Sequence, residues 1–204
     1  MTVRFAGLDG EMSGTLVAQH RLIQIGIALS EEEVFSSRIG WQDAEYDPEA
    51  LAAIGLSPAD LTIGPPVEEV DQAGSAWLRE RGVEDNSLIA VGWGVTAFDL
   101  PFVITTLPLV TDLLHHHSIE LNALCYSLEG AKPYAGRRPT AAEWKKMAKA
   151  VAATRLLLGR DLDTQWHDAG YDALTSLLSW QWLRQVIADP CPGGVRPSPA
   201  PEAE

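Results

Sequence analysis

The sequence predicts an α/β domain in which a mixed five-stranded sheet carries helices on both faces. Three observations lead to this fold class. Short apolar runs of strand length recur five times along the chain, and the first three precede any long helical pattern. A polar turn of a few residues joins the second and third runs, which predicts an antiparallel hairpin. The later runs alternate with amphipathic helices, which is typical of strands packed between helical layers.

Five segments are expected to form the strands. The second has nearly alternating apolar residues, and a polar SEEE turn leads from it into the third. The fourth leads into a glycine-punctuated turn, and the fifth turns directly into a helix that Gly130 ends. The expected strands are Val3–Leu8, Arg21–Leu29, Glu33–Trp41, Ser87–Gly94 and the segment that starts at Ser118.

Helices are expected between and after these strands. Pro48 suits the first turn of one helix, and Gly55 suits its C-terminal cap. Thr140 and Glu143 have the spacing of a capping box at the start of another. The expected helices are Asp47–Gly55, Pro65–Gly82, Ala97–Leu109, Thr140–Gly159 and His167–Ile187, with a further short turn at Ser57–Leu61.

The chain of 204 residues suits one domain followed by a tail. Residues 1–189 are expected to form the folded domain. Residues 190–204 are acidic and rich in proline and glycine, so a disordered tail is expected there. No apolar run reaches about 18 residues, so no membrane span is expected. The N-terminus lacks a signal-peptide pattern, so the expected compartment is the cytoplasm.

Composition narrows the function without deciding it. The net charge of −13 argues against a basic face that grips duplex phosphates. It is still compatible with a nucleic-acid enzyme whose positive charge comes from bound metal ions. Cys125 and Cys191 are too few and too far apart for a disulfide framework or a zinc site, so both are expected to be unpaired thiols.

Two smaller clusters each allow two interpretations. His115–His117 precedes the fifth strand, and it is interpreted either as a solvated loop or as a site for a soft metal ion. The segments EWKKMAK and GRR, together with Lys132, form the basic concentration of the chain. They are interpreted either as a solvated helix face or as one side of a cleft that tracks the phosphates of a single strand.

The most informative stretch is FAGLDGEMSG, in which an apolar strand ends in Asp9 and Glu11 with Gly10 between them. Side chains two positions apart on a strand point to the same side, so the two carboxylates converge if the strand continues through them. Like charges at close range raise each other's pKa unless a cation is present. Hard oxygen ligands then favour magnesium or manganese. The alternative is a solvated turn, because Asp and Gly are ordinary turn residues.

Two further segments supply titratable groups in a fixed order. Asp99 follows the fourth strand and a glycine-rich bend at the start of a helix, where the helix dipole also favours an acid. His167 and Asp172 lie five residues apart at the start of the last helix, where a lone histidine is more often a cap or a packing residue. The order is therefore D-x-E, then F-D, then H-x-x-x-x-D.

In this order the motifs resemble the DEDD superfamily of 3′–5′ exonucleases, also called DnaQ-like, which has a ribonuclease H-like fold. The resemblance spans nearly all of Val3–Ile187. A histidine five residues before the last aspartate is the spacing of the DEDDh branch, whereas the DEDDy branch would have tyrosine at Asp168. The DGEMSG stretch is similar to the opening of oligoribonucleases. The segment after the first helix and FDLPF look more like the proofreading and DNA-trimming members.

The resemblance implies hydrolysis of phosphodiester bonds at the 3′ ends of single-stranded nucleic acid, either DNA or short RNA, with release of nucleoside monophosphates. It implies two divalent metal ions, Mg²⁺ or Mn²⁺, which together clamp the phosphodiester. Asp9, Glu11 and Asp172 would hold the first ion. Asp9 and Asp99 would hold the second.

The same resemblance assigns the remaining roles. His167 would be the general base that takes the proton of the attacking water, which suits a near-neutral pKa. The backbone around Met12 and Ser13 would receive the sugar of the terminal nucleotide. Independently of the resemblance, Phe98 and Phe102 lie near the site in the sequence, and two interpretations are open for them, stacking on a base or packing in the core.

Three departures and three alternatives stay open. Gly94 replaces the asparagine that the family often has in its second motif, Ile54 replaces a histidine, and Glu120 stands where an aspartate is usual. Besides an exonuclease that acts alone, the chain could be a catalytically weak or silent nucleic-acid-binding module of the same fold. It could also be a proofreading subunit bound to a DNA polymerase. A homodimer is a further candidate assembly.

Overall fold

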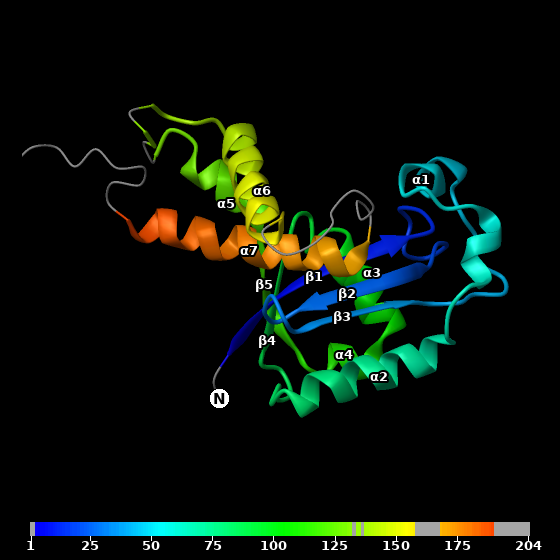
Figure 1. Ribbon diagram of the computed structural model, residues 1–204. Coiled ribbons are helices and arrows are strands. Elements are labelled where there is room, and N and C mark those ends of the chain that lie inside the picture. The colour runs from blue at the N-terminus through cyan, green and yellow to red at the C-terminus, as the bar shows by residue number, and fades with distance from the viewer. Residues whose placement is uncertain (1–2, 132–133, 136, 158–167, 190–204) are drawn as a thin grey trace, which may run out of the picture.

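The computed structural model describes residues 3–131, 134–135, 137–157 and 168–189. It confirms an α/β fold built on one mixed sheet with the strand order β3-β2-β1-β4-β5 (Figure 1). The hairpin is confirmed, because β1, β2 and β3 pair antiparallel, whereas β1–β4 and β4–β5 pair parallel. The strands are β1 (Arg4–Met12), β2 (Leu22–Ala28), β3 (Val34–Arg38), β4 (Leu88–Gly92) and β5 (Leu114–Glu120). The helices are α1 (Pro48–Ala53), η1 (Pro58–Thr62), α2 (Val67–Glu80), α3 (Asp99–Thr106), α4 (Pro108–Thr111), α5 (Leu121–Leu128), α6 (Ala141–Leu157) and α7 (Ala169–Ala188).

Helices cover both faces of the sheet, as the sequence predicts. Helices α2, α3 and α4 pack on one face, while α7 crosses the other and carries α6 and α5 against it (Figure 1). Successive side chains of β1 point to opposite faces of the sheet. Ala6 and Leu8 pack in the core under α2–α4, whereas Phe5 packs against Trp180 of α7. Residues in odd-numbered positions of β1 therefore face α7.

Two glycines allow α7 to lie directly on the sheet. A Cβ atom at Gly7 would stand 1.8 Å from the carbonyl oxygen of Ala173, and one at Gly26 would stand 1.9 Å from that of Ala169. Both obstacles are backbone atoms, so no rotamer change could relieve them. The N-terminal turn of α7 is consequently fixed against the centre of β1 and β2.

The expected caps are present. Asp47 accepts a hydrogen bond from the backbone N–H of Glu49 at the start of α1, and Gly55 follows the helix with φ +71°. Thr140 and Glu143 form the expected capping box at α6. Among the described residues, we find no helix with the length and apolar character that spanning a membrane requires.

The structure corrects the interpretation of His115–His117 as a loop. The three residues belong to β5, which starts at Leu114 rather than at Ser118. The register between β4 and β5 moves from Leu88 opposite Leu114 to Ala90 opposite Ser118, so a bulge holds the histidines at the edge of the sheet. Polarity alone could not reveal this, because an edge strand tolerates exposed polar residues.

Two further details differ from expectation. The predicted helix Ala97–Leu109 divides at Leu107 into α3 and α4, because Pro108 starts a new helix instead of ending the first. Asp71 of α2 is buried, and its carboxylate oxygens accept hydrogen bonds of 3.0 Å from the backbone N–H groups of Leu109 and Val110. An apolar periodicity cannot predict a buried acid that caps a distant helix.

Candidate active site

Strand β1 carries Asp9 and Glu11 past the point where its parallel neighbour ends. The pairing of β1 with β4 covers only Arg4–Gly7, whereas its pairing with β2 continues through Asp9 and Glu11. The strand therefore does extend through both acids, and both occupy odd-numbered positions on the α7 face. Glu11 is buried, and Asp9 is partly buried.

Helix α7 brings a third carboxylate to the same place. Asp172 lies in its first turn, which the contacts of Gly7 and Gly26 hold against the sheet. One carboxylate oxygen of each of Asp9, Glu11 and Asp172 lies within 4.8 Å of one from each of the others. The site thus gathers three acids from two elements that are far apart in the sequence.

The fourth acid joins from α3, and Gly10 explains how. Asp99 is buried, and its Oδ1 accepts a hydrogen bond of 2.8 Å from the backbone N–H of Gly10. A Cβ atom at Gly10 would stand 2.7 Å from Cδ1 of Leu22 on the opposite face of the strand. The glycine between the two acids therefore leaves room for Leu22 while its amide fixes Asp99.

The cluster has strongly perturbed electrostatics. Burial, followed by the charges of Asp99 and the other cavity acids, raises the pKa of Asp9 to about 9. Burial and then the charge of Asp172 raise the pKa of Glu11 to about 8. Burial also raises the pKa of Asp99 to about 6, although its hydrogen bond from Gly10 opposes the change. At neutral pH, Asp9 and Glu11 are therefore anions only beside a cation.

The acids line a cavity of about 350 Å³ between β1, α3, α6 and α7. Its apolar wall includes Trp93 and Phe98, and its cationic wall consists of Lys145 and Lys149. Phe98 is 49% exposed, whereas Phe102 is buried in the core. The two phenylalanines thus have different environments, and only Phe98 is placed to meet a ligand.

Asp168 is a polar support beside the cluster that sequence reasoning missed. It caps α7, with Oδ1 accepting from the Tyr171 N–H and Oδ2 accepting at 2.9 Å from Nε2 of Gln24. Gln24 in turn is the β2 partner of Glu11. The sequence signal for Asp168 was an acid directly before a helical pattern, which is typical of an N-cap. His167, the predicted general base, lies outside the described residues.

The predicted sugar contacts have unequal exposure. Met12 lines the cavity. Ser13 is fully buried, with its hydroxyl donating to Glu45 O at 2.6 Å and its N–H donating to Arg21 O at 2.9 Å. Its carbonyl accepts from the N–H of Asp47 at 2.7 Å. Ser13 therefore anchors the segment before α1, and a direct contact with substrate stays a prediction.

The family departures have local structural reasons. Gly94 has φ +91°, a conformation that strains other residues, and its N–H donates to Oε1 of Glu120 at 2.9 Å. Glu120 also accepts from the backbone N–H of Asn122 at 3.0 Å and so caps α5. Ile54 packs against the small apolar cluster of Leu51 and Leu61. None of the three residues lines the cavity or contributes a carboxylate to the cluster.

Comparisons with known proteins identify the fold. Neither the scan against protein-family models nor the search of curated proteins finds a match. Among solved structures, cell-death related nuclease 4 (CRN-4) matches with a TM-score of 0.57 and 13% identity, over 90% of this chain and 64% of that one. E. coli Exonuclease I in complex with a dT13 oligonucleotide matches with a TM-score of 0.60 and 16% identity, over 92% of this chain and 42% of that one. The zinc-bound form of an E. coli ExoI–ssDNA complex matches with a TM-score of 0.58 and 16% identity, over 92% of this chain and 41% of that one.

The likeness confirms the ribonuclease H-like fold. It extends over nine tenths of this chain. The chain spans less than two thirds of CRN-4 and about two fifths of Exonuclease I. At these identities the comparison concerns the fold, and the chemistry has to be argued from the cavity.

Proposed function

We propose that this protein is a metal-dependent 3′–5′ exonuclease that releases nucleoside monophosphates from single-stranded nucleic acid. The observation that carries the proposal is the convergence of Asp9, Glu11 and Asp172 within 4.8 Å, in a cavity that also contains Asp99. Structures with the same fold include E. coli Exonuclease I bound to single-stranded oligonucleotides, which supports the substrate class.

The carboxylates fit divalent metal ions. Four acids face one cavity, three of them with a pKa raised above the ordinary range, and a structural role would not require so many buried like charges. All of the donors are hard oxygens, which suit Mg²⁺ or Mn²⁺. Asp9, Glu11 and Asp172 would hold one ion, and Asp9 and Asp99 a second. When bound, the ions supply the activation of water and the neutralisation of phosphate charge.

The protein's own groups would position and deprotonate the reactants. His167, five residues before Asp172 as in the DEDDh branch, takes the proton of the attacking water. The water oxygen bonds to phosphorus as the P–O3′ bond breaks. The 3′ oxygen of the shortened strand then takes a proton from solvent, and the product is a nucleoside 5′-monophosphate. Phe98 offers a half-exposed ring on which the terminal base can stack.

The cavity dimensions favour a strand end over a duplex. A volume of about 350 Å³ is at the lower end of the range of small-molecule sites, which accommodates roughly a nucleotide and not two paired strands. The acidic chain, with net charge −13, also lacks the overall charge for gripping a duplex. Both features support a single-stranded 3′ end as the substrate.

The test uses 5′-labelled oligomers of DNA and RNA with the same sequence. We expect stepwise shortening from the 3′ end with Mg²⁺ or Mn²⁺, none with EDTA, and 5′-monophosphates as the only small products. Asp9→Asn should abolish release, whereas Asp43→Asn, at an exposed position outside the cavity, should not change it. Binding without any cleavage in either metal would instead identify a silent nucleic-acid-binding module. The oligomer that is shortened faster identifies the preferred substrate, DNA or RNA.

A further inference from the structure

We propose that Lys145 and Lys149 of α6, laid against the ring of Trp93, form a phosphate-binding subsite for a linkage of the substrate strand. The inference rests on the proposed exonuclease function and assigns the cationic wall of its cavity. It concerns the binding of the strand and adds no step to the hydrolysis.

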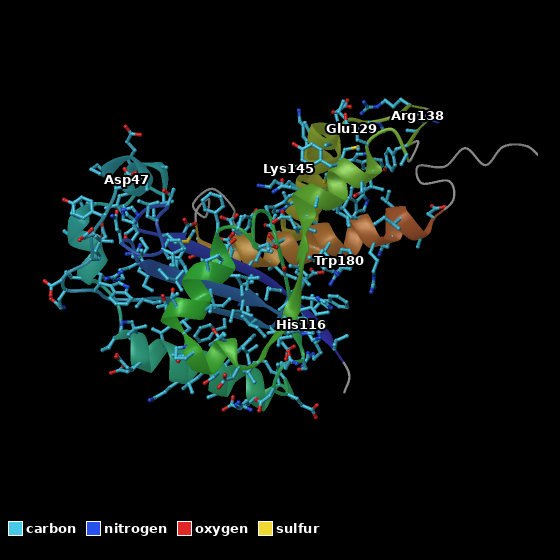
Figure 2. The ribbon with its side chains drawn as sticks, turned by 180° about the vertical axis from the view of Figure 1, so that it is seen from behind. Asp47, His116, Glu129, Arg138, Lys145 and Trp180 are labelled. Atoms are coloured by element: carbon cyan, nitrogen blue, oxygen red, sulfur yellow. The ribbon has the colours of Figure 1, made fainter. Side chains whose placement is uncertain are left out.

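The subsite is built from one helical row. Trp144, Ala148 and Ala152 are fully buried on one side of α6. Lys145 and Lys149 each follow a member of that row, so the two side chains emerge beside the buried face, one turn apart. Figure 2 shows Lys145 on the flank of the α5–α6 pair that is turned toward the α1 end of the molecule. Both lysines line the cavity of the acids.

The two ammonium groups are held in place by the wall behind them. Nζ of Lys145 donates a hydrogen bond of 3.0 Å to Oδ1 of Asn122, and it lies 5.1 Å from the centre of the Trp93 ring. Nζ of Lys149 lies 5.7 Å from the same ring centre. Glu120 accepts from the amide of Asn122 and so fixes the group that orients Lys145. The lysines are thus positioned before any ligand arrives.

This arrangement leaves charge available for an anion. Two like charges one turn apart on a helix destabilise it slightly, so folding gives no reason for the pair. No carboxylate lies within 4 Å of either ammonium group among the residues that the structure describes. Burial and then the charge of Lys149 lower the pKa of Lys145, although the charge of Glu120 opposes the change.

A phosphodiester is the anion that fits this place. The opposite wall of the cavity consists of four acids, so it offers an anionic strand no positive charge until metal is bound. The lysines supply two positive charges on the other side, at a distance that still affects Asp9, since Lys149 lowers the pKa of that residue. Lysine is a point-charge phosphate binder, which suits a backbone read without regard to base.

The third lysine of α6 provides a matched control. Lys146 is on the same helix and is exposed, outside the residues that line the cavity. We would compare Lys145→Gln, Lys149→Gln, the double variant and Lys146→Gln. Each substitution removes one positive charge from α6. Kinetics of mononucleotide release would be measured at several KCl concentrations with saturating Mg²⁺.

The double variant should raise KM at least tenfold while kcat changes by less than about threefold, and Lys146→Gln should match the wild type. Each phosphate contact to a single strand contributes about 0.7 to the slope of log affinity against log salt, so losing the one phosphate that the two lysines share should reduce the slope by about 0.7. Trp93→Phe should retain most of the affinity, and Trp93→Leu should lose it. Oligomers with one uncharged methylphosphonate linkage should show which phosphate is bound. When the replaced linkage is the bound one, the wild type and the double variant should have the same KM.

The failures of the two proposals are distinguishable. Variants of Lys145 and Lys149 that behave like Lys146→Gln in an active enzyme would overturn the subsite and leave the exonuclease standing. If the wild type releases no nucleotide, the exonuclease fails, and anisotropy with a labelled oligomer then tests the subsite alone. In that case, a salt slope unchanged by the double variant would overturn the subsite too.

Discussion

In the metal-free protein, the end of β1 carries an electrostatic penalty that one substitution should relieve. Burial, followed by the charges of the other cavity acids, raises the pKa of Asp9 from 3.8 to about 9. An acid whose pKa is higher in the folded state binds more protons there than in the unfolded chain. The free energy of unfolding therefore falls as pH rises between these two values, starting near pH 4.

Asp9→Asn replaces the carboxyl with an amide of similar size that has no proton to lose. At pH 7 the group is about 3 pH units above its ordinary value of 3.8, and each unit corresponds to 1.36 kcal/mol. The wild type has therefore lost about 4 kcal/mol through this group by pH 7. Without metal, the variant should be the more stable protein, and its advantage should grow by about 1.4 kcal/mol for each pH unit between 5 and 7.

Urea unfolding at pH 5, 6 and 7 in EDTA measures this difference, and the seven tryptophans supply a fluorescence signal. Asp43→Asn removes the same charge at an exposed position, so its stability relative to the wild type should not depend on pH in this range. An Asp9→Asn advantage that stays constant from pH 5 to 7, or shrinks, would refute the reasoning about burial and repulsion.

The stability advantage of Asp9→Asn should shrink when metal is added. Mn²⁺ at 100 times its Kd should stabilise the wild type by about 2.7 kcal/mol, because it binds only the folded state. Asp9→Asn has lost a ligand and should gain much less. A mere packing effect of the amide would not respond to Mn²⁺, so a variant that gains as much as the wild type would show that Asp9 is not a ligand.

Two further substitutions probe the frame and the base. Gly26→Ala should destabilise the protein by about 3 kcal/mol or more and reduce nucleotide release, because its Cβ would meet the carbonyl of Ala169. The control is Gly82→Ala, where nothing lies within 4 Å of the added Cβ; it should cost about 1 kcal/mol in the same urea assay. His167→Ala should lower kcat by roughly 10²–10⁴ and leave the Mn²⁺ affinity measured by calorimetry unchanged. A loss of Mn²⁺ affinity would make His167 a ligand and remove it as the base.

Much of the fold was predictable because local patterns and global packing agree. The apolar runs that became β1, β2 and β4 are buried, and the caps at Asp47 and Thr140 stand where the sequence suggests. The errors occur where exposure and burial are decided by distant residues. His116 and His117 are exposed because β5 is an edge strand, a position that only the assembled sheet defines.

The candidate site divides in the same way. Asp9 and Glu11 could be expected to converge from the period of a strand alone, since the geometry is local. Bringing Asp99 and Asp172 to them required a resemblance, because no spacing rule connects residues that lie 90 and 163 positions from Asp9 in the chain. The cationic wall was visible only as a basic helix segment. Its split into Lys145 and Lys149 toward the cavity and Lys146 away from it depends on which row of α6 is buried.

An acidic protein that handles an acidic polymer must separate its long-range and short-range electrostatics. The net charge of −13 repels a strand at distances beyond a Debye length, and salt screens this repulsion and so favours encounter. Contacts of Lys145 and Lys149 with a phosphate respond in the opposite sense, because salt competes for them. The salt dependence of the wild type alone is therefore a sum of two opposed effects. A single change from lysine to glutamine alters the net charge equally at positions 145, 149 and 146, so the long-range part cancels in the comparison with Lys146→Gln. The difference in salt slope that remains comes from contacts in the cavity. A slope that is shallower in the Lys145 and Lys149 variants than in Lys146→Gln would show that this wall of α6 binds the strand.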